Sequence, residues 1–190
     1  MKYVIKVIEI IGVAGAGKST LTKRLSENFP DWEVCFRLPR FKTLFYQLQA
    51  VTRNILPLLL YSEKKTLFNN IKIIAHIYST ARYLSINKSY ADKVIVFDQG
   101  VIFEYASLCN VGLCNAPKEY LKTINDGYMR KYFESIDVAV FLTAPDEVLY
   151  ERVINRKINH RLKNFNEEET KDFFNGYNQV FNETKSNLKK

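Results

Sequence analysis

The stretch GVAGAGKS, residues 12–19, decides the fold of this 190-residue chain. It matches the phosphate-binding pattern G-x-x-x-x-G-K-[ST] without a mismatch, and Thr20 follows it. Residues 3–11 read as an apolar strand directly before the loop, and a helix is expected to begin near Lys18. This is the context that a phosphate-binding loop requires, because the glycines let successive N–H groups point inward, and the positive end of the following helix faces the same point.

The loop supplies the candidate residues for binding a nucleoside triphosphate. Lys18 can reach the β- and γ-phosphates, and the Ser19 hydroxyl can coordinate Mg²⁺. The alternative is a glycine-rich turn whose lysine is only solvated, but motif and context together favour nucleotide binding. The full set of candidates is Gly12, Ala14, Gly15, Ala16, Gly17, Lys18, Ser19 and Thr20.

Strand-like and helix-like segments alternate along the rest of the chain. After Pro39, a helix with Leu44, Leu48, Val51 and Ile55 on one face is expected to stop at the next proline, Pro57. The alternation predicts one α/β domain over residues 1–190, with three α/β/α layers and a mainly parallel sheet covered by helices on both faces. Further strands are expected at residues 33–38, 94–97 and 137–142, and further helices at 65–84, 101–110, 117–134, from 145 and from 166.

Composition and charge limit the classes of protein to which this chain can belong. With 47% hydrophobic and 25% charged residues, the chain can form a packed core and is not a disordered protein. The net charge of +8 favours anionic partners such as nucleotides. The three cysteines, Cys35, Cys109 and Cys114, form no metal or disulfide pattern, which indicates a reduced, cytoplasmic protein. The apolar run at 55–61 is too short to span a membrane, so no membrane partner is expected.

Asp98 is the second candidate group, because it follows the purely apolar run at 94–97. In a parallel sheet, an acidic residue at the carboxyl end of such a strand points into the ligand crevice. Asp98 could therefore hold Mg²⁺ through water or accept the proton of an attacking group. Its alternative role is to cap the following helix.

Three arginines in the C-terminal half form a third candidate group. Arg152 and Arg156 are four residues apart on one expected helix and share a face, and Arg161 follows after a short polar stretch. Arginines in such a place stabilise the negative charge of a phosphoryl group in transfer. A solvated basic helix face is the alternative.

Arg37, Arg40 and Arg82 form a fourth group, between the phosphate loop and Asp98. They could hold a phosphate or carboxylate of an acceptor by bidentate hydrogen bonds, or they could form structural salt bridges. His76, which stands in an apolar helix, is expected to pack.

The chain resembles the P-loop kinases of nucleosides and nucleoside monophosphates, most nearly the thymidylate-kinase-like branch. The resemblance rests on IIGVAGAGKSTLTKRL, FRLPR, VIVFDQG and VAVFLTAPDEVLYERVINRKINHR, and it extends to about Arg161. It implies the P-loop NTPase fold, with the phosphate loop at 12–19, an acceptor-side helical region at about 40–88 and a lid at about 152–165.

The resemblance also implies roles for the candidate residues. Asp98 would act as base or metal-shell ligand, Arg37 would help to hold the acceptor, and the three C-terminal arginines would form the lid. Two features depart from the family: Gln99 stands where the family has an arginine, and no strand is expected after Arg161, although the family ends with a fifth strand.

The sequence therefore predicts a Mg²⁺-dependent kinase that transfers the γ-phosphoryl group of ATP to a nucleoside, a nucleoside monophosphate or a similar small acceptor. One alternative is a kinase of nucleic-acid 5′-hydroxyls, but no basic run with interleaved aromatics marks a strand-binding groove, so nucleic acid is not the expected partner. Another is a regulatory nucleotide-binding module. The 12 Tyr and 13 Phe residues leave open whether the chain packs as a monomer or forms a homodimer.

Overall fold

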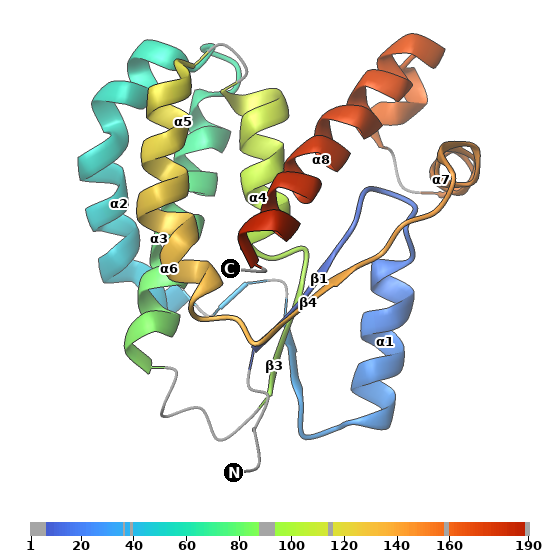
Figure 1. Ribbon diagram of the computed structural model, residues 1–190, viewed down its shortest axis with the longest axis horizontal. Coiled ribbons are helices and arrows are strands. Elements are labelled where there is room, and N and C mark those ends of the chain that lie inside the picture. The colour runs from blue at the N-terminus through green and yellow to red at the C-terminus, as the bar shows by residue number, and fades with distance from the viewer. Residues whose placement is uncertain are drawn as a thin grey trace.

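A four-stranded parallel sheet forms the centre of the computed structural model, which describes residues 7–35, 37–38, 40–87, 94–113, 116–157 and 160–188 (Figure 1). Ile10 pairs with Asp98 on one side and with Val140 on the other, so the strand that leads into the phosphate loop ends beside Asp98. The strands, in the order β2-β3-β1-β4, are β1 (Val7–Ile11), β2 (Glu33–Cys35), β3 (Ile95–Asp98) and β4 (Val138–Phe141).

Helices connect the strands, and the expected segments at 101–110 and 117–134 contain π-helical turns. The α-helices are α1 (Lys18–Asn28), α2 (Arg40–Tyr61), α3 (Leu67–Asn87), α4 (Val101–Ser107), α5 (Lys118–Ile124), α6 (Arg130–Phe133), α7 (Asp146–Ile154) and α8 (Glu167–Leu188). The π-helical turns η2 (Leu108–Gly112) and η3 (Asn125–Met129) continue α4 and α5, and the 3₁₀ turn η4 (Arg161–Asn164) follows α7.

Strand β1 is buried on both faces, which divides the helices into two layers. Ile8 and Ile10 pack against side chains of α1, whereas Val7 and Ile11 belong to the large core formed with α3, α4, α6 and α8. Figure 1 shows α1 on one side of the sheet and these helices on the other. The three-layer α/β/α architecture is thereby confirmed, and β1 is apolar on both faces because both are covered.

The expectation that the second helix stops at Pro57 is wrong, because α2 continues to Tyr61. A proline inside a helix removes one hydrogen bond and crowds the preceding turn. Leu58, the next residue, is fully buried in the core. Its burial stabilises the last turn and offsets the missing hydrogen bond.

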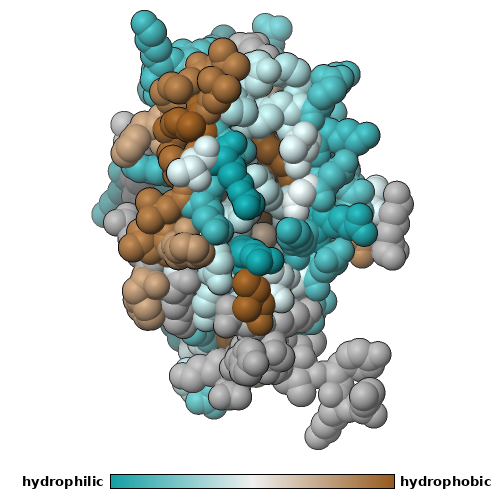
Figure 2. All heavy atoms as spheres, turned by 90° about the vertical axis from the view of Figure 1, so that its left-hand side faces the viewer, coloured by the Kyte–Doolittle hydropathy of each residue, from teal (hydrophilic) through white to brown (hydrophobic). Residues whose placement is uncertain are grey.

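The apolar face that the sequence pattern identifies on α2 is mostly exposed (Figure 2). Leu44, Leu48 and Ile55 are exposed, whereas Ala50 is fully buried and Val51 packs beside it. Because α2 carries apolar residues on two faces, helical periodicity alone could not show which face meets the core.

The carboxyl group of Glu9 is fully buried in the middle of β1. It accepts hydrogen bonds from the backbone N–H groups of Ile102 (2.9 Å) and Phe103 (3.4 Å) and from the Tyr132 hydroxyl (2.5 Å). A Cβ on Gly100 would lie 2.8 Å from the Glu9 Cδ, so only glycine allows this approach. Burial raises the pKa of Glu9 to about 8. Glu9 thus joins β1 to α4 and α6.

Some sequence expectations fall outside the residues that the structure describes: residues 3–6 of the first strand, Phe36, and Cys114. Residues 160–188 contain no strand, as expected. Among the described residues, no helix combines the length and apolar character needed to cross a membrane.

Replacing Glu9 by Gln tests the buried carboxyl. The pKa of Glu9 rises from an ordinary 4.5 to about 8 in the folded protein, so its contribution to stability is fully present below pH 4.5 and is lost as the pH rises toward 8. We expect the free energy of unfolding in urea to fall more steeply between about pH 5.5 and pH 8 in the wild type than in Glu9→Gln, whose amide does not titrate. Equal pH dependence in the two proteins would contradict the burial argument.

Candidate functional site

The phosphate loop has a left-handed backbone at two glycines. Gly15 and Gly17 have φ angles of 88° and 94°, which other residues adopt only with strain. A Cβ on Gly15 would also lie 2.5 Å from the Leu149 carbonyl oxygen of α7. The loop therefore depends on glycine both for its turn and for its contact with α7.

Lys18, the first residue of α1, lies buried inside the curve of the loop. Its Nζ donates to the carbonyl oxygens of Gly12 (2.7 Å) and Val13 (3.0 Å) and lies 5.3 Å from the centre of the Phe103 ring. Burial lowers the pKa of Lys18 to about 8, against the opposing effect of the Asp98 carboxylate. The ammonium group is thus held where the loop would receive phosphate oxygens.

Asp98 lies next to the start of α1, as its position after β3 predicts. Its Oδ2 accepts hydrogen bonds from the hydroxyls of Thr22 (3.4 Å) and Ser19 (3.5 Å). Its buried Oδ1 has no hydrogen-bond partner among the described residues. Gln99 follows with a φ angle of 62°, an uncommon conformation for a residue other than glycine and one found often at functional sites.

The oxygen atoms of Ser19 and Asp98 fit Mg²⁺, which prefers hard oxygen ligands. The unpartnered Oδ1 of Asp98 supports this fit, because a buried carboxylate oxygen ordinarily has a donor or a cation beside it. In the described parts of the chain, no group of three or more His, Cys, Asp or Glu side chains is placed to hold a metal. A magnesium ion at Ser19 and Asp98 would therefore take its remaining ligands from phosphates and water.

Arg152 contacts the phosphate loop directly, whereas Arg161 is held by side chains of α8. The Arg152 Nη1 on α7 donates to the carbonyl oxygen of Gly15 (3.2 Å). Arg161 donates to the Tyr177 hydroxyl (3.1 Å), and its guanidinium lies 4.5 Å from the centre of the Phe173 ring. Two residues of α8 thus position Arg161.

A cavity of about 500 Å³ is lined by the loop on one side and by Arg156 and Arg161 on the other. Its lining includes Lys18, Ser19, Arg156, His160 and Arg161. Burial, together with the nearby cations Arg161, Arg156 and Lys18, lowers the pKa of His160. Its Nδ1 accepts a hydrogen bond from a backbone N–H in η4, so the ring is neutral there while the three cations supply positive charge to the cavity.

Of the residues expected on the acceptor side, Arg37 is placed most clearly. It donates through Nε (3.2 Å) and Nη2 to Oε1 of Glu104 on α4. Oε2 of Glu104 lies 2.6 Å from Nδ1 of His76 on α3, and both of these side chains are buried. Arg82 is exposed on α3 and is not part of the cavity lining, and the Arg40 side chain lies outside the described part of the structure.

Sequence reasoning did not single out Glu104 or the aromatic pair that positions Arg161. Glu104 is an acidic residue in the apolar segment VIFEYA, and such a residue signals a buried partner. Its partners could not be identified from the sequence, because Arg37 lies 67 residues away and His76 lies 28 residues away.

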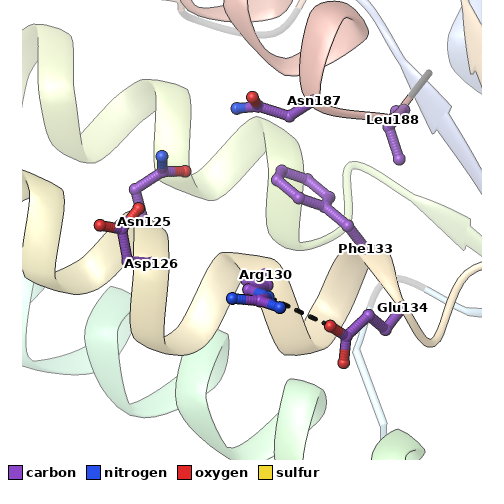
Figure 3. Close-up of a pocket in the computed structure, with 7 residues that line it drawn as sticks. All are labelled: Asn125, Asp126, Arg130, Phe133, Glu134, Asn187 and Leu188. Carbon is purple, nitrogen blue, oxygen red and sulfur yellow. Dashed lines mark hydrogen bonds and ion pairs between the residues drawn. The ribbon is translucent and has the colours of Figure 1, made fainter. Parts of the chain in front are cut away.

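A second hollow, of about 540 Å³, lies between η3, α6 and the end of α8 (Figure 3). Arg130 there is paired with Glu134 (3.3 Å), and the Phe133 ring lies between the two helices. None of the residues that the sequence singles out lines this hollow. The cavity at the phosphate loop is therefore the candidate site.

Comparisons with known proteins agree with this fold. No family model matches the chain, and no curated protein sequence matches it. The solved structure of deoxyadenosine kinase from M. mycoides with bound dATP is similar at a TM-score of 0.56, covering 94% of this chain and 85% of that chain at 19% identity. The same enzyme with products dCMP and a flexible dCDP bound gives a TM-score of 0.56, with 93% and 84% covered at 21% identity. The chain thus shares the α/β fold of a nucleoside kinase.

The affinity for nucleotide is expected to fall above pH 8. Because Lys18 has a pKa of about 8, it loses its charge, and its attraction for phosphate, as the pH rises past that value. Titration calorimetry with ATP should show a dissociation constant that rises by up to about tenfold between pH 8 and pH 9. In Lys18→Arg, whose guanidinium stays charged, binding should be weaker but nearly independent of pH over this range. A pH-independent wild type would contradict the role of the Lys18 charge.

Proposed function

We propose that this chain is a Mg²⁺-dependent kinase that transfers the γ-phosphoryl group of ATP to a hydroxyl of a deoxynucleoside. One observation carries the proposal: Lys18 and Ser19 line a cavity together with Arg156 and Arg161, and Asp98, at the carboxyl end of β3, accepts a hydrogen bond from the Ser19 hydroxyl. Phosphoryl transfer needs little more than positioning and charge stabilisation, and this cavity supplies both.

On the donor side, backbone N–H groups of the loop and the Lys18 ammonium would bind the phosphates. Bound Mg²⁺ would neutralise the charge of the phosphates. Ser19 and Asp98 would hold the ion, because the Ser19 hydroxyl oxygen and the Asp98 Oδ2 lie 3.5 Å apart. Arg152, which reaches the loop itself, and the other two lid arginines would stabilise charge on the transferring group.

On the acceptor side, Arg37 would contact the nucleoside. Glu104 holds the Arg37 guanidinium from within the core, and His76 holds Glu104 in turn. A planar guanidinium fixed in this way has a defined orientation, which suits it to recognise an acceptor group by hydrogen bonding. Arg40 and Arg82 remain predicted to bind the acceptor, but neither takes part in the hydrogen bonds among Arg37, Glu104 and His76.

The deoxynucleoside class is proposed from the fold comparison. The similar structures of the M. mycoides enzyme hold dATP in one case and dCMP and dCDP in another. We place the reaction in the cytoplasm, because the three cysteines of the sequence form no disulfide pattern, as in proteins of reducing compartments.

A phosphoryl-transfer screen tests the function directly. With ATP and Mg²⁺, deoxynucleosides should be phosphorylated at about 1–100 s⁻¹, faster than nucleoside monophosphates or a 5′-hydroxyl oligonucleotide. Lys18→Ala should abolish transfer and leave the circular dichroism spectrum unchanged. Turnover only with the oligonucleotide would favour the nucleic-acid kinase, and ATP binding without any turnover would favour the regulatory module.

Glu104→Gln tests the acceptor side separately. Loss of the charge-assisted hydrogen bonds to Arg37 should raise the KM for the deoxynucleoside by about tenfold or more, with the KM for ATP unchanged. Glu134→Gln is the matched control, because Glu134 pairs with Arg130 on the exposed surface of α6. If both variants change the two KM values alike, Glu104 has only a structural role.

A further inference from the structure

His160 lines the cavity at the phosphate loop, and the proposed function gives it no role. It directly precedes the 3₁₀ turn η4, and its half-buried ring shares the cavity wall with Arg156 and Arg161. Its Nδ1 accepts a hydrogen bond from the backbone N–H of Leu162 (3.2 Å). One of the two ring nitrogens is therefore bound to the backbone of η4.

That hydrogen bond fixes where the imidazole carries its hydrogen. A ring nitrogen that accepts from an N–H group uses its lone pair and holds no hydrogen of its own. The neutral ring then carries its hydrogen on the other nitrogen, Nε2, which becomes a hydrogen-bond donor. In the described part of the chain, Nε2 of His160 has no hydrogen-bond partner. The ring thus offers an unused N–H group to the cavity that it lines.

The charges around the ring keep it in this neutral form. The cations that face it, among the described residues, are Lys18 of α1, Arg156 after α7, and Arg161 and Lys163 of η4. Burial has the largest effect and, together with these cations, lowers the pKa of His160 below its ordinary 6.5. On α8, the titratable group that lines the same cavity is Tyr177. At pH 7 the imidazole is therefore a neutral donor among cations.

The cavity lies where a phosphoryl group passes from donor to acceptor. Residues of the phosphate loop line one part of it, and Gln99, which follows Asp98, lines another. The backbone of such a loop cradles the α- and β-phosphates, and its lysine reaches the β- and γ-phosphates. The γ-phosphate of a bound nucleotide therefore extends beyond the loop, into the space between Lys18 and the His160 ring.

A neutral N–H group complements the cations of this cavity. The charge of an arginine or lysine acts over several ångströms, so it attracts a diphosphate as well as a triphosphate. A hydrogen bond is short and directional, so Nε2–H acts only on the phosphate oxygen within its reach. Because that oxygen is charged, the bond is about twice as strong as one between neutral groups. His160 is thus suited to distinguish a triphosphate from a diphosphate.

We propose that His160 binds the γ-phosphate of the donor nucleotide through Nε2–H, while Nδ1 holds the ring on η4. The two nitrogens have separate roles, one in the structure of the turn and one toward the ligand. The proposal rests on the proposed function, because it takes ATP to be the phosphoryl donor. It adds a phosphate contact to those of the loop and of the arginines.

Nuclear magnetic resonance of the imidazole nitrogens, in isotope-labelled protein, tests both roles. The chain has two histidines, and His160→Gln assigns their signals by the loss of one. At pH 7 and without nucleotide, the His160 ring should be in the Nε2–H form. Its Nε2 signal should shift when the β,γ-imido analogue of ATP binds with Mg²⁺, and should change little with ADP. His76, which does not line the cavity, is the internal reference.

Two substitutions separate the roles of the nitrogens. In His160→Asn, the amide oxygen can replace Nδ1 and keep the hydrogen bond from Leu162, but nothing replaces Nε2–H. The dissociation constant of the ATP analogue, measured by titration calorimetry, should rise about tenfold or more, with that of ADP unchanged. In His160→Gln, the longer amide can replace Nε2–H but not Nδ1. Its affinity for the analogue should stay within about threefold of the wild type, while the Tm falls by about 2–4 °C.

Asn166→Ala is the matched control. The Asn166 side chain caps the start of α8 by accepting from the backbone N–H of Glu169 (2.9 Å), and it is not part of the cavity lining. Its loss should lower the Tm to a similar extent as His160→Gln, because both variants lack one cap. Both dissociation constants should remain those of the wild type.

The outcomes distinguish this proposal from the proposed function. If His160→Asn and the wild type bind the ATP analogue equally, or if the Nε2 signal does not respond to the analogue, the role of Nε2–H is overturned and the kinase function stands. An equal loss of affinity for ADP and for the analogue in His160→Asn would leave His160 only its cap. A wild type that binds neither nucleotide would overturn the proposed function and this proposal with it.

Discussion

The buried carboxyl of Glu9 organises the molecule around its central strand. A carboxyl group taken out of water must be hydrogen-bonded, and here its donors come from the first turn of α4 and from Tyr132 of α6. Helix α4 carries Phe103, whose ring lies beside the Lys18 ammonium, and Glu104, which holds Arg37. One buried polar group in β1 thereby sets the position of the helix that contacts both the donor side and the acceptor side.

The features that the sequence could predict are those formed by residues close together in the chain. The phosphate loop is contiguous and is built largely from backbone, so its residue pattern was enough to locate it. Asp98 could be found because a purely apolar strand ends there. The network of Arg37, Glu104 and His76 could not, because its members come from three distant segments and their meeting depends on how α3 and α4 pack.

Helix α2 shows a different limit of sequence reasoning. Periodicity locates apolar faces but does not rank them, and α2 has two. The apolar face with Leu44, Leu48 and Ile55, which the sequence pattern shows, is the exposed one. The expected stop at Pro57 was wrong for a related reason, since burial of Leu58 is a tertiary effect that local propensity does not contain. Both differences arise where packing, and not local sequence, decides the structure.

The two hydrogen bonds from Lys18 to its own loop have a consequence for how nucleotides bind. A glycine-rich loop would ordinarily lose conformational entropy when a ligand orders it. Here the ammonium group already ties Gly12 and Val13 together, so that loss has occurred during folding. A diphosphate and a triphosphate then meet the same preorganised cradle, and the difference between their affinities measures the contacts of the γ-phosphate alone.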